Sequence, residues 1–425
     1  MLTRLDLRGL GLNIAGHLPA PQDPGSSVAE AVREIIAEVR ARGDQALLEL
    51  TERFDHVSLE RLTVSKEEIS QAMARVPQEL QVALKTAYEQ IHNYHADEAT
   101  PPNPHRTQGV TVSHRDIAVE RAGCYAPGGL ARYPSSVLMC VAPARVAGVQ
   151  EIILCVPPTP EGVIDDVTLA AAHVAGVDEV YAVGGAQAIA AMALGTESIA
   201  AVDVIVGPGN SYVAEAKRQL SGVVGVASAF AGPSEIVVIA DETTPATYAA
   251  IDLMVQAEHG PDGLAWLITT SEAVADAVDD ELSRLVGISP RRALLESTLS
   301  SQGVVCLVDS REAAMAVSNV VAPEHLELLV DEYHDLLGYL RAAGAVFCGI
   351  DAPASLGDYA AGPNHILPTN RSARFSSALR ADDFRRHIHV VEVSREGFER
   401  LAPTVIALAE AEGLSAHVDS VRLRA

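Results

Sequence analysis

The chain has 425 residues, more than a single hydrophobic core usually serves, so we expect two large domains or one domain with added parts. Acidic residues outnumber basic ones by 56 to 31, and the net charge of -25 argues against nucleic-acid binding. Five scattered cysteines without a CxxC pair predict reduced, mostly buried thiols rather than a thiolate metal site.

Residues 1–22 lack the basic start and sustained apolar stretch of a signal or transit peptide. Polar residues or prolines interrupt every apolar run before the ~20 residues that a membrane-spanning helix needs. We therefore expect a cytoplasmic protein without a membrane partner. Apolar periodicity predicts two long helices, over residues 27–53 and 65–96, the second with Ser65 and Glu68 at capping-box spacing. We assign residues 1–115 to an N-terminal helical section and expect it to pack on the second sheet domain.

Short apolar runs alternate with helical stretches through the middle of the chain, a pattern typical of right-handed βαβ units. Buried parallel strands are predicted over residues 151–156, 178–183, 202–206, 235–240, 265–269, 304–308 and 345–348. Helices are predicted between them over residues 166–175, 186–194, 211–220, 245–258, 313–320 and 332–343. The fold class is therefore α/β, with two Rossmann-like parallel-sheet domains over residues 116–233 and 234–373.

The last segment, residues 374–425, contains a predicted strand over residues 387–393 and a final helix over residues 395–412. It is short enough to be an arm that packs on another part of the assembly. Glu412 and His417 follow this helix, with Gly413 suited to a left-handed helix stop. On its own, this pattern is an ordinary chain end.

Two pairs of polar side chains could perform chemistry in the second sheet domain. Gln256 and His259 are three residues apart near a helix end, so both side chains lie on one face and could share a ligand. Glutamine is a rare zinc ligand, however, and a surface helix carries such a pair by chance. Glu324 and His325 can both move protons near neutral pH, although neighbouring side chains of a regular strand face opposite ways. They can serve one pocket only if Pro323 keeps the segment irregular.

The stretch over residues 355–369 interrupts an apolar region with glycines, prolines and polar groups, which indicates a functional loop. Asp358 and His365 are its candidate metal ligands. The ordinary interpretation is a turn or cap for the aspartate and a hydrogen-bonded loop residue for the histidine.

Two strand–turn–helix segments rich in glycine could aim backbone N–H groups at a phosphate, one over residues 183–187 and one over residues 206–210. Neither matches GxGxxG, so a tight βα connection explains each as well. A third turn-rich element over residues 124–136 contains Tyr125, which could stack on a flat ring.

In combination and in chain order, these segments resemble the histidinol dehydrogenase family from end to end. The motifs are CYAPGG, YPSSVLM, AVGGAQA, VGPGNSYVAEAKR, AGPSE, QAEHGPD, APEHLEL, SLGDYAAGPNHILPT and EGLSAH. The resemblance implies two successive NAD-dependent oxidations, from L-histidinol through L-histidinaldehyde to L-histidine, within histidine biosynthesis. The first sheet domain would then bind NAD, and the second would hold the zinc and acid–base residues.

The resemblance also implies roles for single residues. The ligands of one zinc ion per subunit would be Gln256, His259, Asp358 and His417. His325, neutral at working pH, would be the general base, and Glu324 would activate water. The substrate contacts would be Ser234, Gln256, His259, His325, Asp358, His365, Glu412 and His417, and the NAD contacts would be Tyr125, Gln187 and Asn210. The arm would cross to a partner subunit, which makes the expected assembly a homodimer.

The chain departs from the family pattern at two places near the expected cofactor. Many members have a basic residue where this chain has Leu130 and Val204, and Arg132 could replace the first. Three other readings stay open from the sequence: a relative that oxidises another polyol or a sulfonated diol, a zinc hydrolase, and a non-catalytic binding protein. The presence of Glu412 and His417 argues against the first, and the complete acid–base pair argues against the last.

Overall fold

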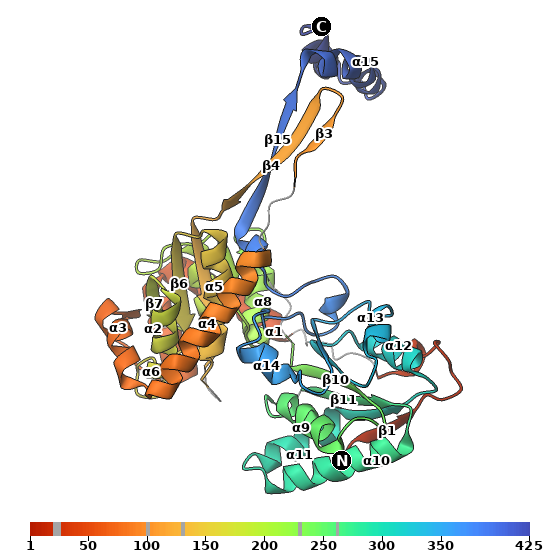
Figure 1. The fold of residues 1–425 in the computed structure, drawn as a ribbon. Coiled ribbons are helices and arrows are strands. Elements are labelled where there is room, and N and C mark those ends of the chain that lie inside the picture. Colours follow the sequence, from red (N-terminus) through yellow and green to blue (C-terminus); the bar gives the residue numbers. More distant parts are fainter. Residues whose placement is uncertain (20–26, 99–102, 129–131, 228–231, 261–262) are drawn as a thin grey trace.

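The computed structural model describes residues 1–19, 27–98, 103–128, 132–227, 232–260 and 263–425. Within these ranges the chain forms two six-stranded sheets, each flanked by helices, and a separate three-stranded sheet. The third sheet leads away from the two larger ones to the C-terminal helices (Figure 1). None of the described helices combines the length and the apolar character that crossing a membrane requires.

The first large sheet has the strand order β2-β7-β6-β5-β8-β9. Its strands are β2 (Thr63–Val64), β5 (Arg121–Tyr125), β6 (Glu151–Val156), β7 (Glu179–Ala182), β8 (Val204–Val206) and β9 (Gly225–Val226). All of them pair in parallel except β2, which is antiparallel to β7. The chain enters at central β5, winds out to β7 and then crosses to β8, so the winding direction reverses between β5 and β8. Such a reversal opens a crevice at the carboxyl ends of the strands.

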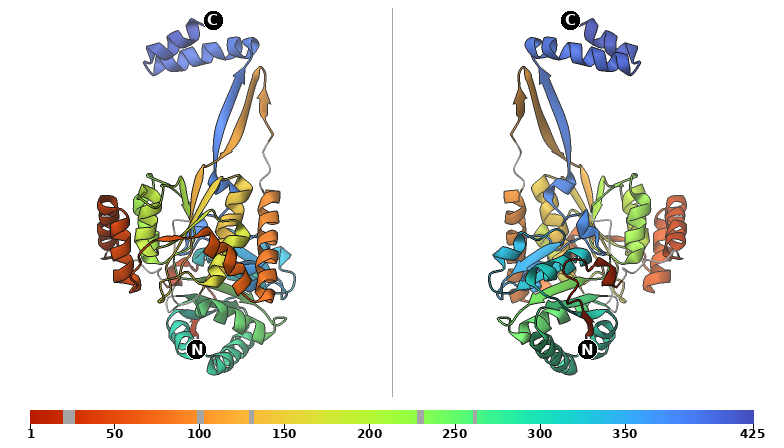
Figure 2. Two further views of the ribbon diagram at one scale, coloured as in Figure 1. Left: turned by 90° about the vertical axis from the view of Figure 1, so that its left-hand side faces the viewer. Right: turned by 90° about the vertical axis from the view of Figure 1, so that its right-hand side faces the viewer.

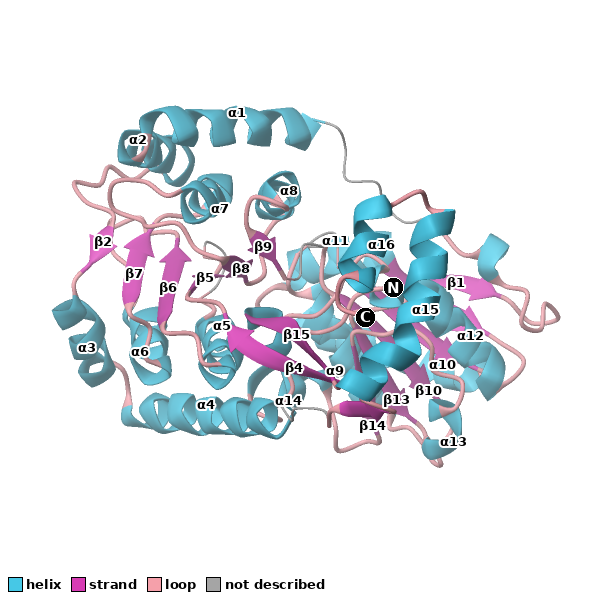
Figure 3. Ribbon diagram, turned by 90° about the horizontal axis from the view of Figure 1, so that it is seen from above, coloured by secondary structure: helices cyan, strands magenta, loops and turns pink. Residues whose placement is uncertain are grey.

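The second large sheet repeats this winding, with the order β1-β12-β11-β10-β13-β14 and parallel pairing throughout. Its strands are β1 (Thr3–Asp6), β10 (Glu235–Ala240), β11 (Leu264–Thr269), β12 (Gly303–Leu307), β13 (His325–Leu329) and β14 (Ala345–Cys348). After the edge strand β1, the chain returns to this sheet at central β10 and reverses its winding direction between β10 and β13. The fold class predicted from the sequence is thus confirmed, and Figure 3 shows the two sheets side by side.

Helices cover both faces of each sheet. Those of the first domain are α5 (Pro134–Ala147), α6 (Asp166–Ala175), α7 (Gly185–Leu194) and α8 (Ser211–Leu220). Those of the second are α9 (Ala246–Ala257), α10 (Glu272–Ile288), α11 (Arg292–Gln302), α12 (Arg311–Val321), α13 (His334–Leu337) and α14 (Ala354–Tyr359). The described residues also form three short 3-10 helices: η1 (Ala15–His17), η2 (Ser372–Arg374) and η3 (Ala381–Phe384).

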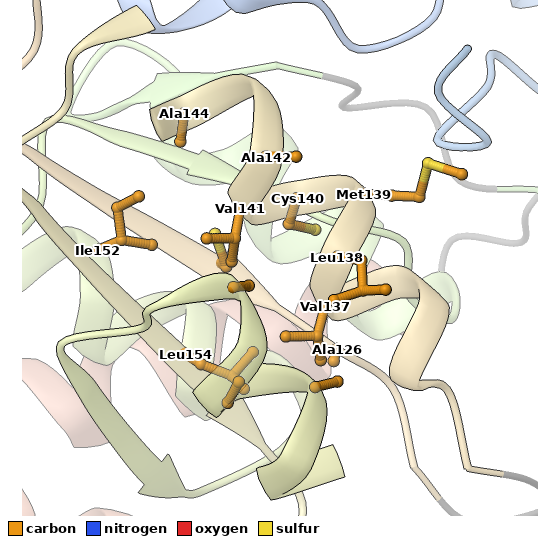
Figure 4. Close-up of a cluster of buried hydrophobic side chains, with 14 of the residues drawn as sticks. Ala126, Val137, Leu138, Met139, Cys140, Val141, Ala142, Ala144, Ile152 and Leu154 are labelled. Atoms are coloured by element: carbon orange, nitrogen blue, oxygen red, sulfur yellow. The ribbon is translucent and has the colours of Figure 1, made fainter. Parts of the chain in front are cut away.

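Alternate residues of the strands enter separate cores on the two faces of each sheet. Figure 4 shows one of these cores, where Val137, Leu138 and Val141 of α5 lie near Ile152 and Leu154 of β6. All five side chains are at most 1% exposed, which explains why the strands appear in the sequence as continuous apolar runs.

The N-terminal helices pack on the first sheet domain, not on the second as we had expected. They are α1 (Ser27–Arg42), α2 (Asp44–Asp55), α3 (Lys66–Arg75) and α4 (Gln78–Glu98). α1 packs on α7 and α8, α3 on α6, and α4 on α5. The apolar faces of α1 and α2 are buried in the same core as Ile189 of α7, which fixes this placement. In the described part of the N-terminal section, β1 is the element that joins the second sheet.

Each of the two long predicted helices is broken into two. The first break is at Gly43, whose φ of 51° is left-handed. The second is at Val76, which adopts an extended backbone before Pro77, as a residue preceding proline usually does. The predicted capping box is confirmed, because Ser65 Oγ accepts the Glu68 N–H and the Glu68 carboxylate accepts the Ser65 N–H.

The arm is built from two distant parts of the chain. β15 (Arg385–Val393) pairs antiparallel with β4 (Val110–Ala118), which pairs with β3 (His105–Thr107). The helices α15 (Arg395–Ala411) and α16 (Ser415–Arg422) follow and lie across the tip of this ribbon (Figure 2). The arm therefore includes residues that we had placed in the N-terminal helical section. The sequence did not predict β4 as a strand because its apolar and polar residues alternate only weakly.

Candidate active site

A cavity of about 1980 Å³ lies between the two large sheet domains. The first domain lines it with residues that follow the carboxyl ends of β5 and β8, including the turn over residues 207–210. The second domain lines it from the opposite edge, where β10, β11 and β13 begin. The cavity is thus enclosed by backbone turns on one side and by titratable side chains on the other.

Two carboxyl groups join the beginnings of β10 and β13. The Glu235 N–H donates to Glu324 Oε2 at 3.1 Å, and the Glu324 N–H donates to Glu235 Oε2 at 3.2 Å. Glu235 Oε1 also accepts the backbone N–H of Asn370 at 3.0 Å. Burial and the neighbouring carboxyl of Glu324 raise the pKa of Glu235 to about 8, and burial raises the pKa of Glu324 to about 7. Glu324 can therefore exchange a proton near neutral pH.

His325 lies beside Glu324 and faces the same cavity, as the proposed acid–base pair requires. The left-handed backbone of Ala322, with φ 50°, ends α12 just before Pro323 and makes the segment irregular, as the sequence argument demanded. His325 Nδ1 lies 3.1 Å from the Glu235 carbonyl oxygen, and Nε2 lies 3.2 Å from Asp358 Oδ1. Since the carbonyl can only accept, Nδ1 carries a proton and Nε2 is the atom that gains or loses one.

The charge of His325 differs from the neutral state that we had expected. Burial alone would lower the pKa of its imidazole, but the charge of Glu324 and the hydrogen bond to Asp358 outweigh burial and raise the pKa to about 9. Neutralising Asp358 would remove part of this effect and bring the imidazole closer to its ordinary pKa.

Asp358 and His365 are brought together by the loop that was predicted to be functional. Asp358 lies in α14, and its carbonyl oxygen accepts the Nδ1–H of His365 at 2.7 Å. His365 Nε2 is 3.3 Å from the hydroxyl of Ser136, at the start of α5. Ser136 is buried and lines the cavity, but the sequence marked it only as part of a turn-rich element.

The side chains of Gln256, His259 and Asp358 all line the cavity and suit a divalent metal ion. Burial lowers the pKa of His259, so its imidazole is neutral and can ligate. Burial opposes ionisation of Asp358, but its hydrogen bond to His325 prevails and lowers the pKa of the carboxyl. Gln256 is buried, and its Nε2 has no hydrogen-bond partner among the residues that the structure describes. Turning the amide would put its oxygen at that position, where a cation could satisfy it.

Glu412 and His417 do not reach this cavity within one chain. Glu412 ends α15 and His417 belongs to α16, both exposed at the far end of the arm (Figure 1). One subunit therefore places three of the four predicted zinc ligands on the wall of this cavity. It also brings together all the predicted substrate contacts except these two, because Ser234 lines the cavity as well.

The predicted NAD residues lie at the carboxyl edge of the first sheet. Asn210 lines the cavity and caps α8, with its side-chain oxygen accepting the N–H groups of Tyr212 and Val213. Tyr125 is 4% exposed, and its hydroxyl accepts the Gly185 N–H at 3.1 Å, so its ring is not free to stack on a ligand in this conformation. Gln187 is buried in α7 next to Gly185.

The two departures from the family pattern lie in the first domain. Val204 is buried in β8, whereas Leu130 falls outside the described residues. The exposed Arg132 lines the cavity, with its Nε 3.9 Å from Asp165 Oδ1.

Two sheets of dinucleotide-binding topology around a cluster of acid–base groups are the architecture of an α/β enzyme. The family model described as histidinol dehydrogenase matches residues 19–425. The chain belongs to the histidinol dehydrogenase family.

The relatives cover nearly the whole chain. The histidinol dehydrogenase of Gluconobacter oxydans is 45% identical over 428 residues, which span 100% of this chain and 99% of the relative. That of Neisseria gonorrhoeae is 46% identical over 397 residues, 92% of each chain. The crystal structure of the Elizabethkingia anophelis histidinol dehydrogenase superposes with a TM-score of 0.95 at 35% identity, covering 100% of this chain and 98% of that one. An acetylating aldehyde dehydrogenase from Geobacillus thermoglucosidasius, at TM-score 0.50 and 14% identity, shares the fold alone.

We predict that the metal-free protein loses stability as the pH rises from about 6 to 9. The folded-state pKa values of Glu235, Glu324 and His325 are about 8, 7 and 9, each above the ordinary value. At these three groups the folded state therefore binds more protons than the unfolded state in this range, and the stabilisation that they contribute is lost as the pH passes these values. Urea unfolding with a chelator present measures the slope. Glu235→Gln should reduce it, whereas the exposed Glu161→Gln should leave it unchanged. A stability that rises over this range would contradict the assignment.

Proposed function

We propose that the protein is a zinc-dependent dehydrogenase that oxidises L-histidinol to L-histidine, through L-histidinaldehyde, in histidine biosynthesis. The observation that supports this most directly is the convergence of Gln256, His259 and Asp358 with the Glu324–His325 pair on one interdomain cavity, in a chain of this family. The alcohol loses two electrons to give the aldehyde, and the hydrated aldehyde loses two more to give the acid. The overall reaction consumes two NAD and one water.

Zinc, when bound by Gln256, His259, Asp358 and the partner subunit's His417, would orient the substrate through its nitrogen atoms. NAD, when bound at the carboxyl edge of the first sheet near Asn210, accepts a hydride in each oxidation. Tyr125 and Gln187 are proposed to contact NAD from the same edge. Ser234, His365 and the partner subunit's Glu412 would hold the polar groups of the substrate.

The proton transfers are assigned to the acid–base pair. A cation held by Asp358 would weaken the negative charge that raises the pKa of His325, so that Nε2 could lose its proton and accept the one from the hydroxyl. The Nδ1–H stays on the Glu235 carbonyl throughout, which keeps the ring in place. Glu324 takes a proton from the water that adds to the aldehyde, for which its pKa of about 7 is suitable. The hydrate again presents a hydroxyl proton to His325, so one base serves both oxidations.

We propose that the active assembly is a homodimer in which the arms are exchanged. The arm exposes apolar side chains on its ribbon and helices, among them Val391, Val393, Leu408 and Leu414, which a partner subunit would cover. Exchange would bring Glu412 and His417 to the cavity of the neighbouring subunit. The reaction is assigned to the cytoplasm, in keeping with cysteines that are all free thiols.

The proposed function predicts two NADH for each histidine formed when the zinc-loaded protein is given L-histidinol and NAD. Absorbance of NADH and chromatographic quantification of histidine measure the ratio in one sample. A chelator should abolish turnover, and added zinc should restore it. Turnover of a simple diol at a rate equal to or above that of histidinol would refute the assigned substrate.

The assigned roles of the acid–base pair predict different defects for two variants. His325→Asn should lower both half-reactions by at least about 100-fold, because both need the same proton acceptor. Glu324→Gln should impair oxidation of added histidinaldehyde more than aldehyde formation, since only the second step uses water. Single-turnover measurements from histidinol and from histidinaldehyde separate the steps. Equal losses in Glu324→Gln would exclude the assigned role.

Arm exchange predicts that two inactive variants complement each other. Asp358→Ala removes a ligand from the body of a subunit, and His417→Ala removes one from its arm. A mixed dimer would contain one site with both defects and one intact site, so subunit exchange between the variants should restore part of the activity. Native mass spectrometry verifies the exchange, and each variant alone is the control. No recovery in verified heterodimers would indicate a site completed within one chain.

A further inference from the structure

A pair of carboxyl groups lies buried behind the cavity, in the core between α9 and the second sheet. Glu327 of β13 is 0% exposed and Asp252 of α9 is 7% exposed. Apolar side chains of α9 and β10, including Ala249, Leu253 and Val238, form the surrounding core. Two ionised carboxylates in such a core would cost far more than this packing could offset. The pair therefore requires a specific arrangement of protons and hydrogen bonds.

The hydrogen bonds of Glu327 indicate that it keeps a proton. Its Oε1 accepts the backbone N–H of Ala354 at 2.6 Å, whereas its Oε2 meets no N–H or hydroxyl donor in the described part of the chain. Glu327 is hydrogen-bonded to the carboxyl of Asp252, and a hydrogen bond between two carboxyl groups needs a proton on one of them. Burial, followed by the charge of Asp252, raises the pKa of Glu327 to about 9. Glu327 is thus a neutral acid that shares its proton with the carboxyl of Asp252.

These hydrogen bonds join the three elements that contribute the proposed site residues. Asp252 precedes Gln256 by one helical turn on α9. Glu327 follows His325 by two residues on β13 and therefore faces the same side of the sheet. Ala354 begins α14, one turn before Asp358. The apolar contacts of this core do not depend on direction and allow the helices to shift. Hydrogen bonds are directional, so those from Glu327 to α9 and α14 fix the distance of both helices from β13.

We propose that Glu327 and Asp252 are positioning residues that hold α9 and α14 against β13 so that Gln256, His259 and Asp358 can share one metal ion. This inference rests on the proposed function, because it assumes the metal site assigned there. In this role Glu327 contacts neither substrate nor cofactor. The pair acts on the site through the backbone of three elements, as outer hydrogen bonds do at other metal centres.

The test compares a variant that removes the hydrogen bonds of Glu327 with one that keeps them. Glu327→Ala should weaken zinc binding to the full-length dimer by about 10- to 100-fold, measured by competition with a chromogenic chelator. Glu327→Gln should stay within about threefold of the wild type, because its amide oxygen accepts from Ala354 and its NH2 donates to Asp252. The KM for NAD should stay unchanged in both variants, since Asn210 and the first sheet are not touched.

A matched control separates positioning from general loss of stability. Leu282→Ala opens a cavity in the same core, on α10, an element that bears none of the site residues. It should lower the urea midpoint while leaving zinc affinity within threefold of the wild type. Zinc affinity that is unchanged in Glu327→Ala, or equally weakened in Leu282→Ala, would overturn the proposal.

A second pair of variants keeps the test decisive if Glu327→Ala does not fold. Asp252→Asn offers its NH2 to Glu327, whereas Asp252→Ala offers nothing, so only Asp252→Ala should lose zinc affinity by tenfold or more. Loss in both variants would overturn the proposal. Measurements on the wild-type protein separate this outcome from a failure of the proposed function. The proposed function fails only if the wild-type protein binds no zinc or does not oxidise histidinol.

Discussion

The arrangement of the cavity depends on the burial of several carboxyl groups where too few positive charges surround them. Glu235, Glu324 and Asp358 converge on a single imidazole, His325. Backbone N–H groups satisfy Glu235 and Glu324 but cannot supply a full charge. Glu235, Glu324 and His325 therefore keep their protons to a higher pH than such groups ordinarily do. A divalent cation beside Asp358, as proposed above, would relieve part of this excess of negative charge.

The repeated winding of the two sheets explains how this charge is kept apart from the edge that is proposed to bind NAD. Both sheets reverse direction next to their central strand, but the cavity meets the carboxyl edge of the first and the amino edge of the second. The first edge presents turns and a helix N-terminus at Asn210, which suit phosphate groups. The second edge presents the side chains that begin β10 and β13. One architecture thus supplies two chemically different walls.

Much of the site could be predicted from the sequence because its residues lie in short motifs that identify the family. Glu324 and His325 are an example, although their convergence required the irregular backbone that Ala322 and Pro323 provide. Tertiary packing was harder to predict. Central β5 escaped notice because its sequence, RAGCY, has only a weak apolar pattern, and the breaks at Gly43 and Val76 were hidden within continuous helical periodicity. The placement of the N-terminal helices and the charge on His325 depend on contacts between residues far apart in the chain, which no local pattern encodes.

The pairing of β4 with β15 has a consequence for the order of folding. Val110 faces Val393 in this ribbon, so nearly the whole of both sheet domains lies between two strands that must meet. Closing such a long loop is entropically costly unless the intervening chain has already become compact. During synthesis, β15 leaves the ribosome only after both domains have emerged. The ribbon is therefore expected to be the last unit to form. Dimer assembly would then wait until both sheet domains of each subunit have folded.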